Sequence, residues 1–141
     1  MALLSEQDRR EVRRQLADLS GPLRLVSFTQ ELACQYCRDT GRLLKEVAEL
    51  SDKIRLEIYN FQLDKTQVDR FGVGKVPAIA IAGTKDCGVR FYGIPLGYGI
   101  ASFLGAIKDA SRGTTDLSLE SREALAEIAQ PVRLQVFSTP T

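Results

Sequence analysis

Residues 23–37 read Leu-Arg-Leu-Val-Ser-Phe-Thr-Gln-Glu-Leu-Ala-Cys-Gln-Tyr-Cys. The first six are mostly apolar and predict a short buried strand, and the pattern from 35 to 50 predicts a helix. Cys34 and Cys37 therefore lie where the loop after the strand enters the first turn of that helix. There one sulfur can be made a good nucleophile and the other can close a disulfide. The stretch predicts thiol–disulfide exchange.

The remaining apolar patterns extend this strand and helix into an α/β domain. Apolar residues at every second position predict a strand over 54–59, and a right-handed crossover through the helix makes it parallel to the first strand. Two further strands flank a segment of turn formers, 83–88, which predicts a hairpin. In chain order we expect helices over 5–19, 35–50, 65–71 and 97–111, and strands over 23–28, 54–59, 78–82 and 89–92.

The composition predicts one domain of about 100 residues with a remainder, because 141 residues that are 44% hydrophobic can bury a single core. With 19 basic and 18 acidic side chains the formal charge is +1, which gives no footprint for nucleic acid or an anionic membrane. No basic segment precedes the first apolar residues, and no apolar run approaches about eighteen residues. Three cysteines are too few for a secreted disulfide framework, so we expect a soluble cytoplasmic protein.

The end of the chain repeats its beginning. Segment 22–29, Pro-Leu-Arg-Leu-Val-Ser-Phe-Thr, resembles segment 131–138, Pro-Val-Arg-Leu-Gln-Val-Phe-Ser, and an amphipathic pattern precedes each. We interpret 1–112 as one redox unit. We interpret 113–141 as a linker followed by the lead-in helix (117–130) and the first strand (132–137) of a truncated second unit.

Two further motifs carry a resemblance to a known family. Val76-Pro77-Ala78 precedes the third expected strand, and 88–97 reads Gly-Val-Arg-Phe-Tyr-Gly-Ile-Pro-Leu-Gly. With the Cys-x-x-Cys pair, these motifs resemble the thioredoxin/glutaredoxin superfamily. Essentially the whole chain is similar to the amino-terminal unit of the tandem protein disulfide oxidoreductases of thermophiles, although the second unit is missing. The resemblance implies a thioredoxin fold, a central mixed four-stranded sheet flanked by helices, with an extra N-terminal helix and a C-terminal helix–strand extension.

The two motif cysteines are the expected catalytic residues. Unpaired N–H groups and the partial positive charge of a helix N-terminus favour a thiolate, so we interpret Cys34 as the nucleophile and Cys37 as the resolving thiol. A merely structural pair of buried cysteines is one alternative. A zinc site is another, for which the chain offers no histidine and only Cys87 as a further thiol. We expect no metal and no bound cofactor, only the redox-active disulfide itself.

The resemblance also implies a substrate-binding shelf at Val76 and Pro77. In the superfamily this peptide bond is cis, and it leaves the backbone of the preceding residue free to pair with an extended substrate. An ordinary proline at the first residue of a strand is the alternative. Within the motif, Tyr36 could cover the disulfide and contact substrate, or be an exposed aromatic without a role, and Gln35 is a spacer.

No residue is an obvious proton acceptor. Many thioredoxins carry a buried carboxylate under the second sulfur, and Ser27 stands at that approximate position. Glu31 in the loop and Glu57 on the second strand are the candidates, each with the alternative of a solvated or paired charge. Lys75 with the shelf would suit glutathione, but the Gly-Gly-x-x-Asp element expected for its carboxylate is absent, which favours protein disulfides. We expect Cys87 to be a spare thiol of moderate burial.

The sequence thus predicts a protein thiol–disulfide oxidoreductase of thioredoxin or glutaredoxin type, serving electron transport and cell redox homeostasis. The alternative is a redox-inactive or weakly active binding or dimerisation module, in which strand 132–137 pairs with an edge of another copy. The expected partners are proteins with disulfides or dithiols and a second copy of the chain in a homodimer. By resemblance, an NADPH-dependent thioredoxin reductase would supply the electrons.

Overall fold

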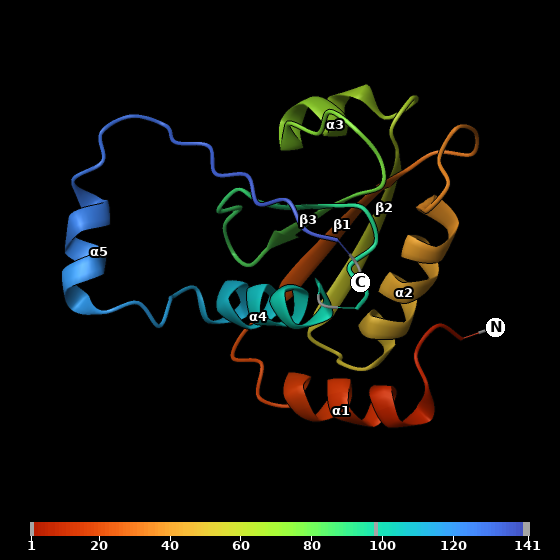
Figure 1. The fold of residues 1–141 in the computed structure, drawn as a ribbon, viewed down its shortest axis with the longest axis horizontal. Coiled ribbons are helices and arrows are strands. Elements are labelled where there is room, and N and C mark those ends of the chain that lie inside the picture. The colour runs from red at the N-terminus through yellow and green to blue at the C-terminus, as the bar shows by residue number, and fades with distance from the viewer. Residues whose placement is uncertain (1, 98, 140–141) are drawn as a thin grey trace.

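The computed structural model describes residues 2–97 and 99–139, and Figure 1 shows their fold. The helices and strands predicted before residue 112 are all present, with ends within about three residues of those predicted. Tyr98, inside the fourth predicted helix, lies outside the described residues, as do Met1 and residues 140–141. In chain order the elements are α1 (Glu6–Leu16), β1 (Leu23–Thr29), α2 (Cys37–Glu49), β2 (Ile54–Asn60), α3 (Lys65–Phe71), β3 (Ala78–Ala82), β4 (Val89–Tyr92), α4 (Gly99–Arg112) and α5 (Leu119–Ala126).

The four strands form one mixed sheet in the order β2-β1-β3-β4. β1 is parallel to β2 and antiparallel to β3, which is antiparallel to β4. In this register Leu25 of β1 is paired with Leu56 on one side and Ile81 on the other. β1 is therefore a central strand, and the predicted mixed sheet is confirmed.

Helices cover both faces of the sheet, because successive residues of β1 point to opposite faces. Leu23 and Leu25 pack in one cluster with buried residues of α1, α2 and α4. Val26 and Phe28 pack in a second cluster with residues of α3. Figure 1 shows α3 on the other side of the strands from α1 and α4. Full burial of a side chain such as Leu25 stabilises the fold by about 1.5–3 kcal/mol relative to exposure.

The additional N-terminal helix, α1, is held at its start by a capping box. Ser5 Oγ accepts a hydrogen bond from the Asp8 backbone N–H at 3.1 Å, and the Asp8 carboxylate accepts one from the Ser5 N–H at 3.2 Å. Val12 and Leu16 are buried one turn apart and place the apolar face of α1 in the first cluster. This helix is thus an integral part of the domain.

The C-terminal segment differs from its prediction. The lead-in helix expected over 117–130 is present only as α5, which buries no residue. Residues 132–137, expected as a strand, form neither helix nor strand, and Leu134 and Val136 are 88% and 92% exposed. The strand prediction is wrong here because a strand needs a neighbouring backbone for its N–H and C=O groups, and the described sheet contains only β1 to β4. The division of the chain at residue 113 stays a prediction.

Candidate active site

Cys34 and Cys37 are joined by a disulfide, with their Cα atoms 5.5 Å apart. Cys37 is the first residue of α2 and is 4% exposed, whereas Cys34 is partly exposed. The helix begins two residues later than predicted, so Cys34 lies before the N-cap residue Tyr36 and not inside the first turn. Cys34 is therefore partly open to solvent, whereas Cys37 is enclosed by the protein.

The loop between β1 and α2 fixes the approach to Cys34. The side-chain amide of Gln30 donates hydrogen bonds to the carbonyl oxygens of Leu32 at 2.7 Å and Ala33 at 3.3 Å. Ala33 has φ of 56°, a left-handed conformation that is uncommon for a residue other than glycine. Leu32 is 78% exposed, so the loop projects an apolar side chain into solvent two residues before Cys34.

The N-terminus of α2 is the source of partial positive charge beside the disulfide. No side chain caps it at Tyr36, and the first N–H groups of a helix have no intrahelical acceptor. The acidic residue of the first turn, Asp39, is paired with Arg42 at 4.0 Å, and its side chain is 47% exposed. This end of α2 therefore presents partial positive charge to a thiolate of the opened disulfide.

Pro77 lies at the same end of the sheet as the disulfide loop. Its peptide bond with Val76 is cis, as the resemblance implied. The next residue, Ala78, pairs with Phe28 of β1, so Pro77 lies beside the end of β1 from which the loop departs. Pro77 is buried, and its carbonyl accepts a hydrogen bond from Gly93 N–H at 3.0 Å. The structure thus brings the predicted shelf and the cysteine pair to the same end of the sheet.

Exposed aromatic rings lie at this end of the sheet. Tyr36, between the cysteines, is 48% exposed, and Gln35 beside it is also exposed. Tyr92 pairs with the residue after Pro77 and is 39% exposed, and the Lys75 ammonium lies 5.0 Å from its ring centroid. The sequence had not singled out Tyr92, although it belongs to the 88–97 motif. Such rings can contact a polypeptide at little entropic cost.

Glu57 is not brought to the cysteines. It pairs in register with Val26, whose side chain packs in the cluster that includes α3, so Glu57 faces away from α2. Arg24 donates two hydrogen bonds to its carboxylate, at 2.6 and 3.1 Å, and Tyr59 Oη donates a third at 3.0 Å. The Arg24 guanidinium above all lowers the pKa of Glu57, against the opposing effect of burial. As a proton acceptor for Cys37, Glu57 stays a prediction that this placement does not favour.

Three other residues near the motif differ in burial. Glu31 is exposed in the loop three residues before Cys34. Ser27 is 2% exposed and lies on the face of β1 that α2 covers, as the expected position beneath the second sulfur requires. Thr40, one turn after Cys37, is 1% exposed and was not among the predicted residues. Its spacing of three from Cys37 in a helix is the signal that could have identified it.

Cys87 lies at the far end of the sheet. The turn that contains it follows Ala82, which pairs with Arg24 near the start of β1, whereas the disulfide loop leaves the other end. The structure exposes Cys87, so the expectation of moderate burial is wrong. Cys87 lines a cavity of about 550 Å³ that also includes residues of α4 and of the segment after it.

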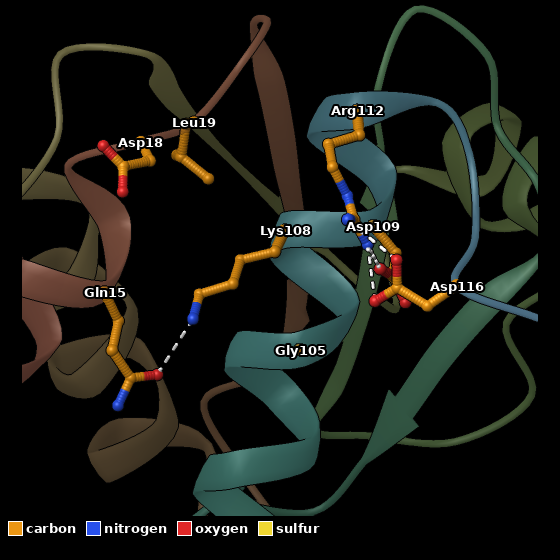
Figure 2. A pocket seen from close by; sticks show the side chains of 8 residues that line it. All are labelled: Gln15, Asp18, Leu19, Gly105, Lys108, Asp109, Arg112 and Asp116. Atoms are coloured by element: carbon orange, nitrogen blue, oxygen red, sulfur yellow. Dashed lines mark hydrogen bonds and ion pairs between the residues drawn. The ribbon is translucent and has the colours of Figure 1, made fainter.

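A second cavity, of about 400 Å³, lies between α1 and α4 (Figure 2). Across it, Lys108 Nζ donates a hydrogen bond to Gln15 Oε1 at 3.3 Å. On its other side Arg112 is paired with Asp109 and, at 3.1 Å, with Asp116. Neither cavity is lined by the motif cysteines or by Pro77.

Residues 2–97 and 99–139 contain no group of three or more His, Cys, Asp or Glu side chains able to hold a metal ion. Over the same part of the chain, no helix has the length and apolar character needed to cross a bilayer.

The structure is similar to solved structures of redox proteins. No protein-family model and no curated protein matches the sequence. The protein disulfide oxidoreductase from Aeropyrum pernix K1 has a TM-score of 0.80 and 31% identity, covering 90% of this chain and 56% of that one. The NTD_N/C domain of the alkylhydroperoxide reductase AhpF from Enterococcus faecalis has a TM-score of 0.72 and 21% identity, covering 85% and 58%. The thioredoxin of Fasciola hepatica has a TM-score of 0.52 and 16% identity, covering 72% and 92%.

The similarity to the A. pernix protein, the sheet order and the Cys-x-x-Cys disulfide at the start of α2 show a thioredoxin-like fold, as the resemblance to the thioredoxin/glutaredoxin superfamily implied. The likeness to AhpF and to the thioredoxin supports the fold alone. Within the superfamily, the chain is similar to the protein disulfide oxidoreductase from A. pernix, in agreement with the resemblance found in the sequence. It spans a little over half the length of that protein.

Proposed function

We propose that the protein is a thiol–disulfide oxidoreductase that exchanges the disulfides of other proteins through Cys34 and Cys37. The observation that carries this proposal is the disulfide itself, with Cys34 partly exposed and Cys37 buried at the start of α2. Exchange through a dithiol needs one accessible nucleophile and a second thiol that resolves the mixed disulfide. This arrangement supplies both.

In the reductive direction the Cys34 thiolate attacks one sulfur of a substrate disulfide. A Cys34–substrate disulfide forms, and the other substrate sulfur leaves as a thiolate. The Cys37 thiolate then attacks Cys34 Sγ, which closes the Cys34–Cys37 disulfide and releases the second substrate thiolate. Two electrons pass from the dithiol to the substrate, and the two released thiolates take up protons from water. The reverse sequence oxidises a substrate dithiol.

The surroundings of the disulfide favour a polypeptide as the substrate. The backbone at Val76 could pair with an extended segment beside the cysteines. The hydrogen bond between Gly93 N–H and the Pro77 carbonyl fixes the backbone at that end of the sheet. Tyr36 and Tyr92 add exposed aromatic surface on either side. We assign Gln35 no contact beyond the motif.

The redox-active disulfide would be the only redox group, without a bound cofactor. An NADPH-dependent thioredoxin reductase remains the expected electron donor, and a cytoplasmic location stays a prediction. A homodimer would bring two such disulfides together. The exposed apolar side chains of residues 132–137 are the surface we expect to join its chains.

Reduction of insulin disulfides in the presence of dithiothreitol tests the proposal. Cys34→Ser should abolish catalysis, because no nucleophile remains. Cys37→Ser should still attack and accumulate the Cys34 mixed disulfide, which a mass spectrum detects. Cys87→Ser is the matched control and should retain wild-type activity, since Cys87 lies at the other end of the sheet.

Equal rates for the wild type and Cys34→Ser would overturn the proposal. That result would favour the alternative of a binding or dimerisation module with the same fold. Activity that is lost in Cys87→Ser but kept in Cys34→Ser would assign the redox reaction to Cys87, at the other end of the sheet, and would equally refute the proposal.

A further inference from the structure

Thr40 is a buried residue of α2 whose hydroxyl lacks a hydrogen-bond partner in the disulfide form. Its side chain is 1% exposed, and its Oγ1 has no partner among residues 2–97 and 99–139. A buried hydroxyl without a partner destabilises the state that contains it, because its hydrogen bonds to water are not replaced. The disulfide form therefore holds an unused hydrogen-bond donor in the interior.

The residue one turn before Thr40 is Cys37. Side chains three positions apart share a helix face, with Cβ atoms about 5–6 Å apart, which lets a hydroxyl and a sulfur meet. Cys37 is 4% exposed, so both side chains point to the interior. When the disulfide opens, Cys37 Sγ loses its bond to Cys34 and becomes a hydrogen-bond acceptor.

The side chains opposite this part of α2 offer little else to a thiolate. The helix packs on β1 and β2, where Ser27 pairs in register with Ile58, which is 48% exposed, and neither residue titrates. Ser27 is the polar one of the two and is 2% exposed. The charged residues of α2's first turn and of the loops at the site are at least partly exposed: Glu31, Arg38, Asp39 and Lys75. Glu46, in the buried part of α2, pairs with Arg9 at 3.4 Å.

We propose that Thr40 Oγ1 donates a hydrogen bond to Cys37 Sγ once the disulfide has opened, and so stabilises the resolving thiolate. This rests on the proposed function and concerns its second step. In that step Cys37 gives its proton to solvent, and its thiolate attacks Cys34 Sγ. The Cys34–Cys37 bond forms, the Cys34–substrate bond breaks, and the substrate leaves as a thiolate. Thr40 keeps its own proton throughout.

Removal of the hydroxyl has two opposite effects on the rate of resolution. Loss of one hydrogen bond to a charged group should raise the titration midpoint of Cys37 by about one pH unit. At neutral pH this cuts the thiolate fraction about tenfold, while the more basic thiolate is about threefold more nucleophilic. Resolution should therefore slow about threefold at neutral pH. Well above both midpoints it should become about threefold faster than in the wild type.

The test follows the Cys37 Cβ chemical shift against pH in reduced protein labelled with [13Cβ]cysteine, in a Cys87→Ser background. Thr40→Val keeps the shape of the side chain and removes the hydroxyl, and Thr40→Ala removes it by a second route if the valine variant folds poorly. Thr40→Ser retains the hydroxyl. Thr66→Val, at an exposed position of α3, is the matched control. Rapid quench of a preformed mixed disulfide gives the rate of resolution of each variant.

The proposal expects the higher Cys37 midpoint and the pH-dependent reversal of rates in Thr40→Val and Thr40→Ala, with wild-type values in Thr40→Ser and Thr66→Val. An unchanged Cys37 midpoint in both hydroxyl-free variants, in protein that still reduces insulin, would overturn it and leave the proposed function intact. A rate that is lower at every pH would also refute it, because a packing defect lacks the reversal. Wild-type protein that fails to reduce insulin would refute the proposed function itself.

Discussion

Two segments of nearly the same sequence pattern, 22–29 and 131–138, have opposite structures. The first contains β1, and its Leu25 and Phe28 are both 0% exposed. The second has no helix or strand, and the corresponding Leu134 and Phe137 are 88% and 86% exposed. Local pattern is the same in both, so it does not decide which segment becomes a strand.

The difference is the presence of neighbours. β1 has a strand on each side and a layer of helix on each face, so every apolar side chain and backbone group finds a partner. The 131–138 segment has no described strand beside it and only the short helix α5 before it. An apolar strand pattern predicts the capacity to pair, and pairing requires the rest of a domain.

The two segments should differ most in stability at the equivalent leucines, Leu25 and Leu134. Leu25→Ala should lower the free energy of unfolding by about 2–5 kcal/mol, because it leaves a cavity at the centre of the sheet. Leu134→Ala should change it by less than about 0.5 kcal/mol, since the side chain is exposed. Urea denaturation of both variants measures the contrast. A loss at Leu134→Ala comparable to that at Leu25→Ala would mean that segment 131–138 is packed in solution.

A smaller difference in stability comes from the ion pair of Arg24, whose counterpart in the second segment, Arg133, has no described strand beside it. Arg24 holds the carboxylate of Glu57, whose pKa is lowered from an ordinary value of 4.5. That interaction therefore stabilises the fold fully above about pH 4.5 and is lost as the pH falls through the lower folded value. After allowance for solvent screening at the partly exposed Arg24, Glu57→Gln should cost about 1 kcal/mol at neutral pH and less in acid.

Urea denaturation at neutral and acid pH checks this prediction. Glu123→Gln, on the exposed helix α5, is the matched control and should leave stability unchanged. A Glu57→Gln penalty that stays constant down to strong acid would contradict an ionic origin for the interaction. It would point to packing of the side chain instead.

The sequence predicted what periodicity and one motif determine, and missed what depends on the third dimension. The strands and helices up to residue 112 followed from apolar spacing, and Cys34, Cys37 and the cis bond before Pro77 followed from the motifs and the resemblance. Alternation placed Glu57 on the face opposite to Ile54, Leu56 and Ile58, but it could not tell which face α2 covers, because both faces of this sheet are covered. The spacing of Thr40 from Cys37 was visible in the sequence, but the lack of a hydrogen-bond partner for its hydroxyl was not.

We infer that the helix terminus makes Cys34 a reactive thiolate and leaves Cys37 protected. The most direct measurement is the pH dependence of alkylation of the reduced chain by iodoacetamide, with peptide mapping to assign each modified cysteine. We predict that Cys34 reacts far faster than Cys37 and titrates clearly below the ordinary thiol value of about 8.5. Equal reactivity of the two thiols, or a Cys34 that titrates at the ordinary value, would contradict the claim and leave the disulfide a structural one.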